Sequence, residues 1–371
     1  MAKNVVVCCD GTANEFATNR TNVAKLFFTL VKNPIEQAVH YHPGVGTMEP
    51  PGALTRTGAL LTRTAGLAFG YGLDRDVRDA YTFIADTFED GDKLFLFGFS
   101  RGAYTVRAVA ALLYMYGLIP KGNAPLVPYA VRMMWAINRL RRKRRPGDAD
   151  DPRIDEYFRL AADFKVTFSR VCKPHFVGVW DTVSSVGWFT SPVSLPYTTY
   201  NSDIAIGRHA VAIDERRAFY RTHLWRLPPD ANKHRNDIKQ VWFPGVHCDV
   251  GGGYPEAESG LSKFPLEWMI AEAEAAGLKV DGGKVATILG RSRDGYARPD
   301  PDALLHQSMR GLWHLAEYAP KPHWNGQATQ WRASLNRPRS WPERPLVHRV
   351  AWERDGGRYA TRLPADAVKY P

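Results

Sequence analysis

The sequence predicts an α/β fold, a mostly parallel β-sheet with helices on both faces. Short apolar runs that end in turns alternate with amphipathic segments through the first half of the chain. This alternation is typical of parallel strands joined by helical crossovers. Of the 371 residues, 44% are hydrophobic and 23% are charged. That balance supports a sizeable core and excludes a mainly disordered chain.

The first expected elements follow from apolar runs and a capping residue. Residues 3–9 are apolar and end in Asp10-Gly11-Thr12, as a buried strand meets a loop. Thr21 is a capping residue at the start of a helix over 21–28. The short apolar run at 37–41 predicts a second strand, because Pro43 and Gly44 end it.

The later elements rest on the same kinds of pattern. Apolar residues at helical spacing in 74–89 predict an amphipathic helix, and the turn at 90–92 separates it from the next strand. The remaining expected strands lie at 93–97, 175–180 and 240–246. The remaining expected helices lie at 103–116, 127–137, 266–276 and 304–317.

The pattern predicts one main domain over residues 1–280 with two additions. Residues 121–165 interrupt the strand–helix alternation and are expected to form a helical, basic insertion over the sheet. Residues 281–371 are rich in Gly, Arg, Pro and Trp, and they are expected to form a C-terminal appendage packed on the main domain.

Charge, apolar runs and cysteines narrow the class of protein. The net charge of +11 fits an anionic lipid surface, nucleic acid or simple solubility. No apolar run is long enough for a signal peptide or a membrane span, so we expect a cytoplasmic protein as synthesised, with export without a cleaved signal left open. The four cysteines form no CxxC pair, which predicts buried free thiols and no metal site or disulfide. No cofactor is expected.

The strongest functional signal is the pentapeptide Gly98-Phe99-Ser100-Arg101-Gly102. A serine nucleophile on a strained strand-to-helix turn needs glycines on either side, because side chains there would meet the neighbouring helix and strand. The pentapeptide lies directly between an expected strand and an expected helix. We therefore predict that Ser100 is a catalytic nucleophile.

A nucleophilic serine needs a base and an orienting acid, in the chain order serine, acid, histidine. Asp181 and His247 each follow an expected strand, and the carboxyl ends of parallel strands meet at one edge of a sheet. We predict that His247 takes the serine proton and that Asp181 holds the imidazole. Asp249 is an alternative acid, and His209 or His223 is an alternative base.

Backbone N–H donors are needed to stabilise a developing oxyanion. Arg101, which follows the nucleophile, is the first expected donor. Gly11 and Thr12 are expected to supply the second, with residues 44–47 as the other choice. Asp10 is an accessory candidate that could hydrogen-bond the N–H groups of its loop.

A basic run spans Arg139 to Arg145. It is either a solvated helix face or a docking surface for anionic lipid headgroups, helped by the apolar residues just before it, which are Met133, Met134, Trp135 and Ile137. The arginines of this expected lipid surface are Arg141, Arg142, Arg144 and Arg145. No nucleic-acid partner is expected, because no recognition fold accompanies the charge.

As an ordered set, these motifs resemble the α/β-hydrolase family that contains the catalytic domains of type VI secretion phospholipase effectors. The stretches that carry the resemblance lie at residues 9–12, 44–47, 96–104, 176–183, 212–217 and 241–254. The resemblance implies an α/β-hydrolase fold and a serine lipase or esterase with the triad Ser100, Asp181 and His247. It also implies phospholipid as the substrate of the effector branch.

The expected function is therefore that of a serine carboxylic ester hydrolase acting on lipid-like acyl esters through an acyl-enzyme. A small-ester esterase, a thioesterase or a peptidase with the same triad is an alternative, as is a catalytically silent binding protein with this fold. The sequence identifies neither an immunity protein nor a secretion machinery as a partner.

Overall fold

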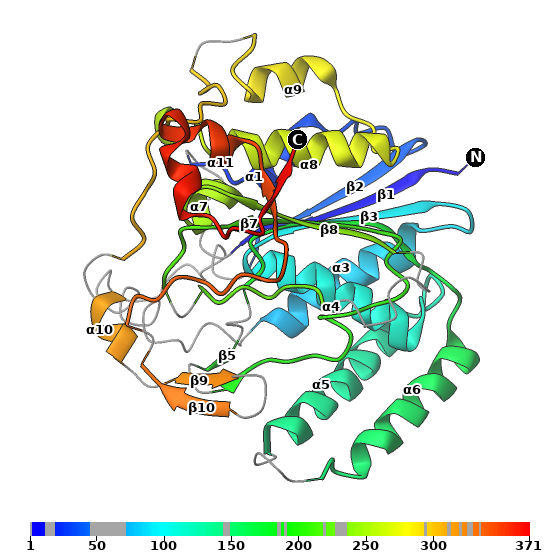
Figure 1. Cartoon of the computed structure of the whole chain (residues 1–371). Helices are drawn as coiled ribbons and strands as arrows, with labels where there is room; N and C mark the ends of the chain where they lie inside the picture. Colours follow the sequence, from blue (N-terminus) through cyan, green and yellow to red (C-terminus); the bar gives the residue numbers. More distant parts are fainter. Residues whose placement is uncertain are drawn as a thin grey trace, which may run out of the picture.

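A single parallel sheet organises the chain. The computed structural model describes residues 2–11, 19–44, 72–143, 149–183, 187–188, 191–217, 220–226, 236–292, 295–309, 313–318, 321–324, 329–333 and 335–371. Eight strands form the sheet in the order β12-β11-β8-β7-β4-β3-β1-β2 (Figure 1). Their bounds, in chain order, are Asn4–Cys9 for β1, Gln37–His42 for β2, Lys93–Phe99 for β3, Pro174–Trp180 for β4, Ile206–Ala212 for β7, Asp237–Phe243 for β8, Leu346–His348 for β11 and Val368–Tyr370 for β12.

Helices cover both faces of the sheet (Figure 1). One face carries α3 (Leu73–Thr87), α4 (Arg101–Tyr116), α5 (Val127–Lys143) and α6 (Arg153–Phe168). The other face carries α1 (Asn22–Thr29), α7 (His247–Gly251), α8 (Lys263–Ala275) and α9 (Gly282–Ile288). The α/β class predicted from the sequence is thus confirmed.

Smaller elements lie around this frame. They are the hairpin strands β5 (Gly187–Trp188) with β6 (Ser191–Pro192) and β9 (Lys321–Trp324) with β10 (Thr329–Arg332), and the helices α10 (Trp313–Tyr318) and α11 (Val350–Glu353). Short 3₁₀ turns occur at Ala124–Leu126, Glu256–Glu258 and Arg354–Arg362.

The first strand shows why the sheet is buried on both faces. Val5 and Val7 belong to the core beneath α3 and α4, whereas Val6 and Cys8 belong to the core beneath α1 and α8. Successive strand residues point to opposite faces, so a continuous apolar run is what a sheet covered on both sides requires. Thr21 caps α1 as expected, since its hydroxyl accepts a hydrogen bond from the Ala24 N–H.

Strand order places the carboxyl ends of β1 and β3 at a switch in chain direction. After β1 the chain crosses to β2 on one side, and after β3 it continues to β4 on the other side. Connections that leave in opposite directions open a crevice at that point, where ligands of open α/β sheets bind. Asp10 follows β1 and Ser100 follows β3, so both residues lie at this crevice.

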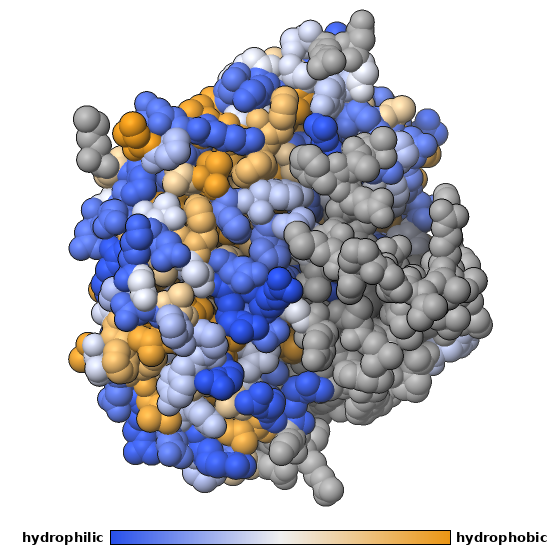
Figure 2. All heavy atoms as spheres, turned by 180° about the vertical axis from the view of Figure 1, so that it is seen from behind, coloured by the Kyte–Doolittle hydropathy of each residue, from blue (hydrophilic) through white to orange (hydrophobic). Residues whose placement is uncertain are grey.

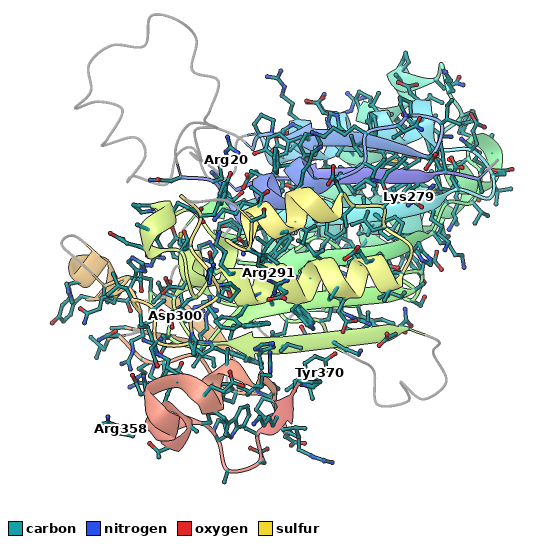
Figure 3. All side chains as sticks on the ribbon, turned by 90° about the horizontal axis from the view of Figure 1, so that it is seen from above. Arg20, Lys279, Arg291, Asp300, Arg358 and Tyr370 are labelled. Carbon is teal, nitrogen blue, oxygen red and sulfur yellow. The ribbon has the colours of Figure 1, made fainter. Side chains whose placement is uncertain are left out.

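Several elements differ from the sequence-based expectation. β7 and α6 were not expected as separate elements, and the helix expected over 304–317 is confined to α10 among the described residues. β11 and β12 extend the main sheet from β8. Tyr370 lies on β12 (Figure 3), and its hydroxyl donates to Glu272 of α8. The predicted boundary near residue 280 therefore separates strands of one sheet.

The surface, the apolar character of the helices and the cysteines were also compared with the expectation. On the face shown in Figure 2, hydrophobic side chains are mixed with hydrophilic ones over the coloured part. None of the helices in the described ranges has both the length and the apolar character of a membrane span. All four cysteines are free thiols; Cys8, Cys9 and Cys172 are buried, as predicted, whereas Cys248 is partly exposed.

Candidate active site

Ser100 occupies a strained turn between β3 and α4. Its φ of 57° and ψ of −118° lie in a region that costs a non-glycine residue free energy and that clusters at functional sites. The Ser100 N–H donates to the Trp180 carbonyl at the end of β4, and the Ser100 carbonyl accepts from Tyr104 N–H in α4. The turn is therefore fixed from both sides, as a nucleophile elbow requires.

The two flanking glycines are required by close backbone contacts. A Cβ on Gly98 would lie 2.4 Å from the Gly102 carbonyl oxygen, and a Cβ on Gly102 would lie 2.1 Å from the Cys9 carbonyl oxygen. Neither obstacle is a flexible side chain. The helix after Ser100 thus packs directly against the end of β1, for the reason predicted from the pentapeptide.

Asp181 and His247 form a buried hydrogen-bonded pair. The Nδ1 atom of His247 lies 2.6 Å from Oδ2 of Asp181, and the two side chains are 4% and 0% exposed. Asp181 follows β4 and His247 begins α7 after β8, so β7, which lies between these strands, sets their separation. The N–H of Ala212 at the end of β7 donates to Oδ1 of Asp181 at 3.0 Å.

The strand that ends just before Ser100 contacts this pair through Phe99. The ring of Phe99, the residue before Ser100, packs on the His247 imidazole with centroids 4.6 Å apart. Because Asp181 faces Nδ1, Nε2 is the imidazole nitrogen that remains for a different partner. Among the described residues, no hydrogen bond joins Ser100 to His247; such bonds are often long in ligand-free enzymes and tighten when substrate binds.

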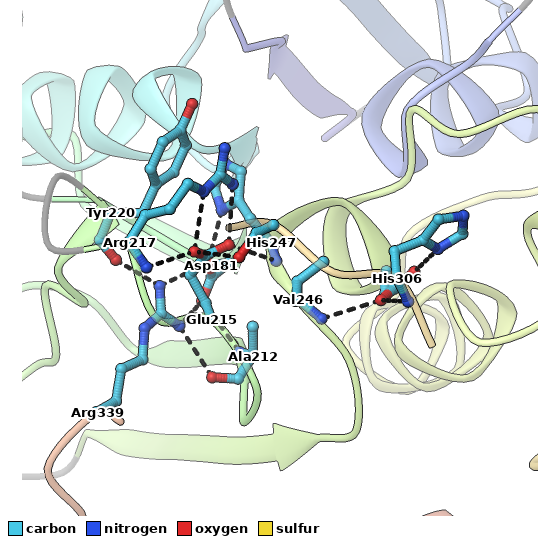
Figure 4. A network of polar contacts seen from close by, with 11 residues as sticks. Asp181, Ala212, Glu215, Arg217, Tyr220, Val246, His247, His306 and Arg339 are labelled. Carbon is cyan, nitrogen blue, oxygen red and sulfur yellow. Dashed lines mark hydrogen bonds and ion pairs between the residues drawn. The ribbon is translucent and has the colours of Figure 1, made fainter. Parts of the chain in front are cut away.

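Charged groups surround the pair (Figure 4). Arg339 contacts both oxygens of Asp181, at 2.5 and 2.9 Å. Glu215 accepts from the His247 backbone N–H at 3.2 Å and from Arg217 at 2.9 Å. Each buried carboxylate is therefore paired with an arginine, which offsets much of the cost of burying charge.

These surroundings shift the ionisation of the site. Burial alone would raise the pKa of Asp181, but the Arg339 guanidinium and the hydrogen bond from His247 outweigh it and hold that pKa well below its usual range. Burial likewise opposes ionisation of Glu215, but the bonds and charge of Arg217 lower its pKa to about 2. Burial lowers the pKa of His247, although Asp181 partly opposes this. The site therefore favours a neutral imidazole beside an ionised carboxylate, as a general base needs.

The alternative acid and bases are engaged elsewhere. Asp249 lies 2.6 Å from Nδ1 of His306 and accepts from the Val246 N–H, so it caps α7 instead of contacting the His247 imidazole. The Nε2 of His209 accepts from the Thr182 N–H and its Nδ1 faces Gln240. His223 is partly buried, and its ring packs edge-on against Tyr104.

The expected oxyanion donors are only partly described. Arg101 is the first residue of α4, where backbone N–H groups have no partner within the helix. The Gly11 N–H donates to Oδ1 of Asp10 at 2.6 Å, so in this structure it is directed at a carboxylate. Oδ2 of Asp10 accepts from the hydroxyls of Thr21 and Tyr41. Thr12 and residues 45–47 lie outside the described residues.

The basic run is described only in part. Arg141 and Arg142 are exposed at the end of α5, whereas Arg144 and Arg145 lie outside the described residues. Three of the four apolar residues expected to assist lipid contact do not lie at the surface. Met133, Met134 and Ile137 of α5 are buried in the core shared with α4, so the expectation is wrong for these three. Trp135 is partly exposed.

Sequence reasoning missed the residues that surround the pair. Glu215 and Arg217 lie in the stretch 212–217, which was part of the resemblance but had no assigned role. Arg339 and Ser308 lie in the C-terminal segment, where no motif marks them. In the parts of the chain that are described, no group of three or more His, Cys, Asp or Glu side chains is placed to hold a metal ion.

Comparison with known proteins identifies relatives of this chain. The chain is 33% identical over 228 residues to the uncharacterized protein YEL023C of Saccharomyces cerevisiae, covering 59% of this chain and 32% of the yeast protein. An uncharacterized Pseudomonas aeruginosa protein of known structure matches with a TM-score of 0.44 and 19% identity, over 79% of this chain and 47% of that one. The Tle1 effector bound to the VgrG spike of the type VI secretion system matches with a TM-score of 0.36 and 15% identity, over 70% and 53%.

The chain therefore spans about a third of the yeast protein and about half of each solved chain. Residues 3–272 match the family model described as "T6SS, Phospholipase effector Tle1-like, catalytic domain". This match includes the serine elbow, Asp181 and His247. The chain belongs to the family of Tle1-like phospholipase effector catalytic domains, a family of lipase-like hydrolases.

Proposed function

We propose that this protein is a serine carboxylic ester hydrolase that acts on phospholipid or similar acyl esters through Ser100, His247 and Asp181. The observation that carries the proposal is the buried 2.6 Å contact between His247 and Asp181 beside a serine held at a φ of 57°. Membership of a phospholipase effector family supports the lipid-like substrate.

The proposed reaction has two half-reactions. The Ser100 hydroxyl oxygen attacks the acyl carbonyl carbon while Nε2 of His247 accepts the serine proton. The tetrahedral intermediate collapses, the ester C–O bond breaks, and the leaving alcohol takes the proton from His247. A water molecule then attacks the acyl-enzyme, His247 accepts one of its protons, and that proton returns to Ser100 as the fatty acid leaves.

The surrounding residues support these steps. The Arg101 N–H, at the start of α4, is proposed to stabilise the oxyanion, because the N-terminus of a helix carries partial positive charge. Asp181 fixes the tautomer of His247 by accepting a hydrogen bond from Nδ1 and stabilises the imidazolium that forms. Gly11 and Thr12 remain the proposed source of the second donor. For Gly11, this requires its N–H to leave the Asp10 carboxylate.

Labelling with a fluorophosphonate probe tests the proposal. An activated serine should form a covalent adduct that mass spectrometry maps to Ser100, and Ser100→Ala and His247→Ala should prevent both the adduct and turnover. Ser169→Ala, far along the chain on the loop after α6, is the matched control and should be labelled normally. Folded wild-type protein without an adduct would refute the proposal and favour a silent binding protein.

Panels of phospholipids, short-chain esters, thioesters and peptides would then identify the substrate class. Faster hydrolysis of long acyl chains in vesicles than of soluble short-chain esters is expected. The reverse order would replace the lipid substrate with a small ester, and cleavage of thioesters or peptides alone would reassign the class. Membership of this family also suggests association with a type VI secretion system.

We further propose that the end of α5 binds anionic membrane surfaces. Arg141 and Arg142 are exposed there, and arginines near a lipid surface each contribute about 1 kcal/mol of attraction to anionic headgroups. Replacing Arg141, Arg142, Arg144 and Arg145 with Ser should reduce co-sedimentation with anionic vesicles. Replacement of the exposed Arg349 and Arg358 with Ser is the control. Equal binding of both variants would leave the basic run as a solvated surface.

A further inference from the structure

The segment after the family match contacts three carboxylates that lie beside His247 or the helix it begins. Residues 3–272 match the family model, yet Arg339 binds Asp181, Ser308 donates to Glu215 and His306 pairs with Asp249. These contacts come from irregular segments of the chain between α9 and β11. Side chains from one segment that reach three separate acids of one site indicate a role in that site.

Arg339 makes the most complete of these contacts. One terminal nitrogen lies 2.5 Å from Oδ1 of Asp181 and 2.9 Å from the Ala212 carbonyl oxygen. The other lies 2.9 Å from Oδ2 of Asp181 and 2.6 Å from the Tyr220 carbonyl oxygen. The side chain is 8% exposed. This two-pronged pairing sets the plane of the carboxylate as well as its position.

The orientation of that plane matters for His247. Oδ1 of Asp181 accepts from the Ala212 N–H and Arg339, which leaves Oδ2 directed at Nδ1 of His247 (Figure 4). A rotated carboxylate would move Oδ2 away from the imidazole. The backbone does not supply this restraint alone, because Ala212 contacts only one oxygen.

We propose that Arg339 is a positioning residue for the ester hydrolysis proposed above, and that it acts by holding the Asp181 carboxylate in the plane that orients His247. The inference rests on that proposed function. It makes the segment after residue 272 an integral part of the active site, since the residue that orients the catalytic acid lies outside the matched domain.

The contacts of Ser308 and His306 support the same arrangement. Ser308 donates to Oε1 of Glu215, whose other oxygen accepts from the His247 N–H. His306 holds Asp249, whose carboxylate accepts from the Val246 N–H at the start of α7. The C-terminal segment thereby restrains the backbone of His247 as well as its acid partner.

Replacement of Arg339 is expected to change both rate and pH dependence. Misplacement of a catalytic group by about 1 Å can cost about 100-fold in rate, so Arg339→Met should slow acylation of Ser100 by about 10- to 100-fold, with the loss in kcat and not in KM. The other charged or titratable groups that face His247 are Asp181, Glu215, Arg217, Tyr220 and Cys248. Loss of the Arg339 cation leaves the net charge around His247 more negative, so the acid limb of the pH–rate profile should move to higher pH.

The experiment compares Arg339→Met, Arg339→Gln and Arg339→Lys in the full chain. Fluorophosphonate acylation rates and kcat/KM are measured against pH, with thermal unfolding as a check on folding. The Arg339→Lys variant keeps the positive charge but loses the two-pronged geometry. It should therefore react more slowly than wild type while the acid limb of its pH–rate profile stays at the wild-type pH. Arg337→Met changes an exposed arginine two residues away and should match wild type.

The outcomes separate this inference from the proposed function. An unlabelled wild-type protein refutes the hydrolase proposal itself. If the wild type is labelled but the Met and Gln variants keep its rate and its acid limb, the role of Arg339 is overturned and the hydrolase proposal stands. If Arg339→Met does not fold, the Lys and Gln variants decide: a slowed Lys variant that keeps the wild-type acid limb supports positioning, and wild-type rates in both variants overturn it.

Discussion

Replacing Asp181 with Asn keeps the shape of the side chain and removes its charge and one acceptor oxygen. The two native oxygens each face a different nitrogen of Arg339, and one also faces Nδ1 of His247 at 2.6 Å. An amide offers one acceptor oxygen and one donor group. In either orientation, therefore, the amide nitrogen of the variant faces a guanidinium nitrogen, and two donors meet.

Two losses follow, and their sizes come from this geometry. Arg339 is 8% exposed, and a buried charge that loses its partner typically costs about 3–5 kcal/mol of stability. If the amide nitrogen faces His247, it donates to Nδ1 and leaves the proton on Nε2, the atom that must accept from Ser100. The same tautomer error lowers kcat about 10⁴-fold in serine proteases, so we expect a loss of that order.

Asp214→Asn provides the matched control. Asp214 is another acid near the site; it accepts from the Gly245 N–H and from the Tyr359 hydroxyl but does not contact His247. That variant should lose stability and keep the rate per folded molecule. Initial rates on a chromogenic ester, normalised by the folded fraction from circular dichroism, give the comparison. A folded Asp181→Asn protein with wild-type turnover would refute the assignment of the acid.

Three other perturbations have definite expected results. Gly102→Ala should prevent labelling of Ser100, because its Cβ would lie 2.1 Å from the Cys9 carbonyl oxygen; a folded variant that is labelled normally would contradict the elbow. Because burial keeps the pKa of His247 below its ordinary 6.5, the rate should reach half of its maximum at a pH below 6.5. A half-maximal rate at a higher pH would contradict a neutral buried base. The lowered pKa of Glu215, about 2 against an ordinary 4.5, means that its contribution to stability is complete above pH 4.5 and is lost as the pH falls toward 2. Urea unfolding at several acidic pH values should show this slope, and Glu215→Gln should flatten it.

The strands that the sequence predicts well are those buried on both faces. β1 and β3 are continuous apolar runs between turns, and the structure bounds them within two residues of the expectation. β7 escaped prediction because Arg208 and His209 interrupt its apolar pattern. Arg208 is tolerated there because it reaches Asp237 and Glu272 at the amino end of the sheet. A long-range ion pair of this kind leaves no local signal.

The same distinction applies to the site. Ser100, Asp181 and His247 lie at or shortly after strand ends, so a local pattern and the rule that strand ends converge were enough to select them as candidates. The structure brings Asp181 and His247 into contact. Arg339 reaches Asp181 across 158 positions of sequence, and nothing in its neighbourhood resembles a motif. Its role depends on the path of the C-terminal segment, which turn and composition signals do not specify.

The charges around His247 explain how a histidine close to two acids can remain a neutral base. Two ionised carboxylates near an imidazole would by themselves raise its pKa, yet burial dominates and the pKa of His247 is lowered. Arg339 pairs with Asp181 and Arg217 pairs with Glu215. The positive charge of each arginine therefore offsets much of the electrostatic effect of its carboxylate on the imidazole. Asp181 can therefore orient the imidazole through a short hydrogen bond without fixing a proton on both nitrogens. For the proposed general base, the two arginines are therefore as necessary as the acid, and Arg339 lies outside the matched residues 3–272.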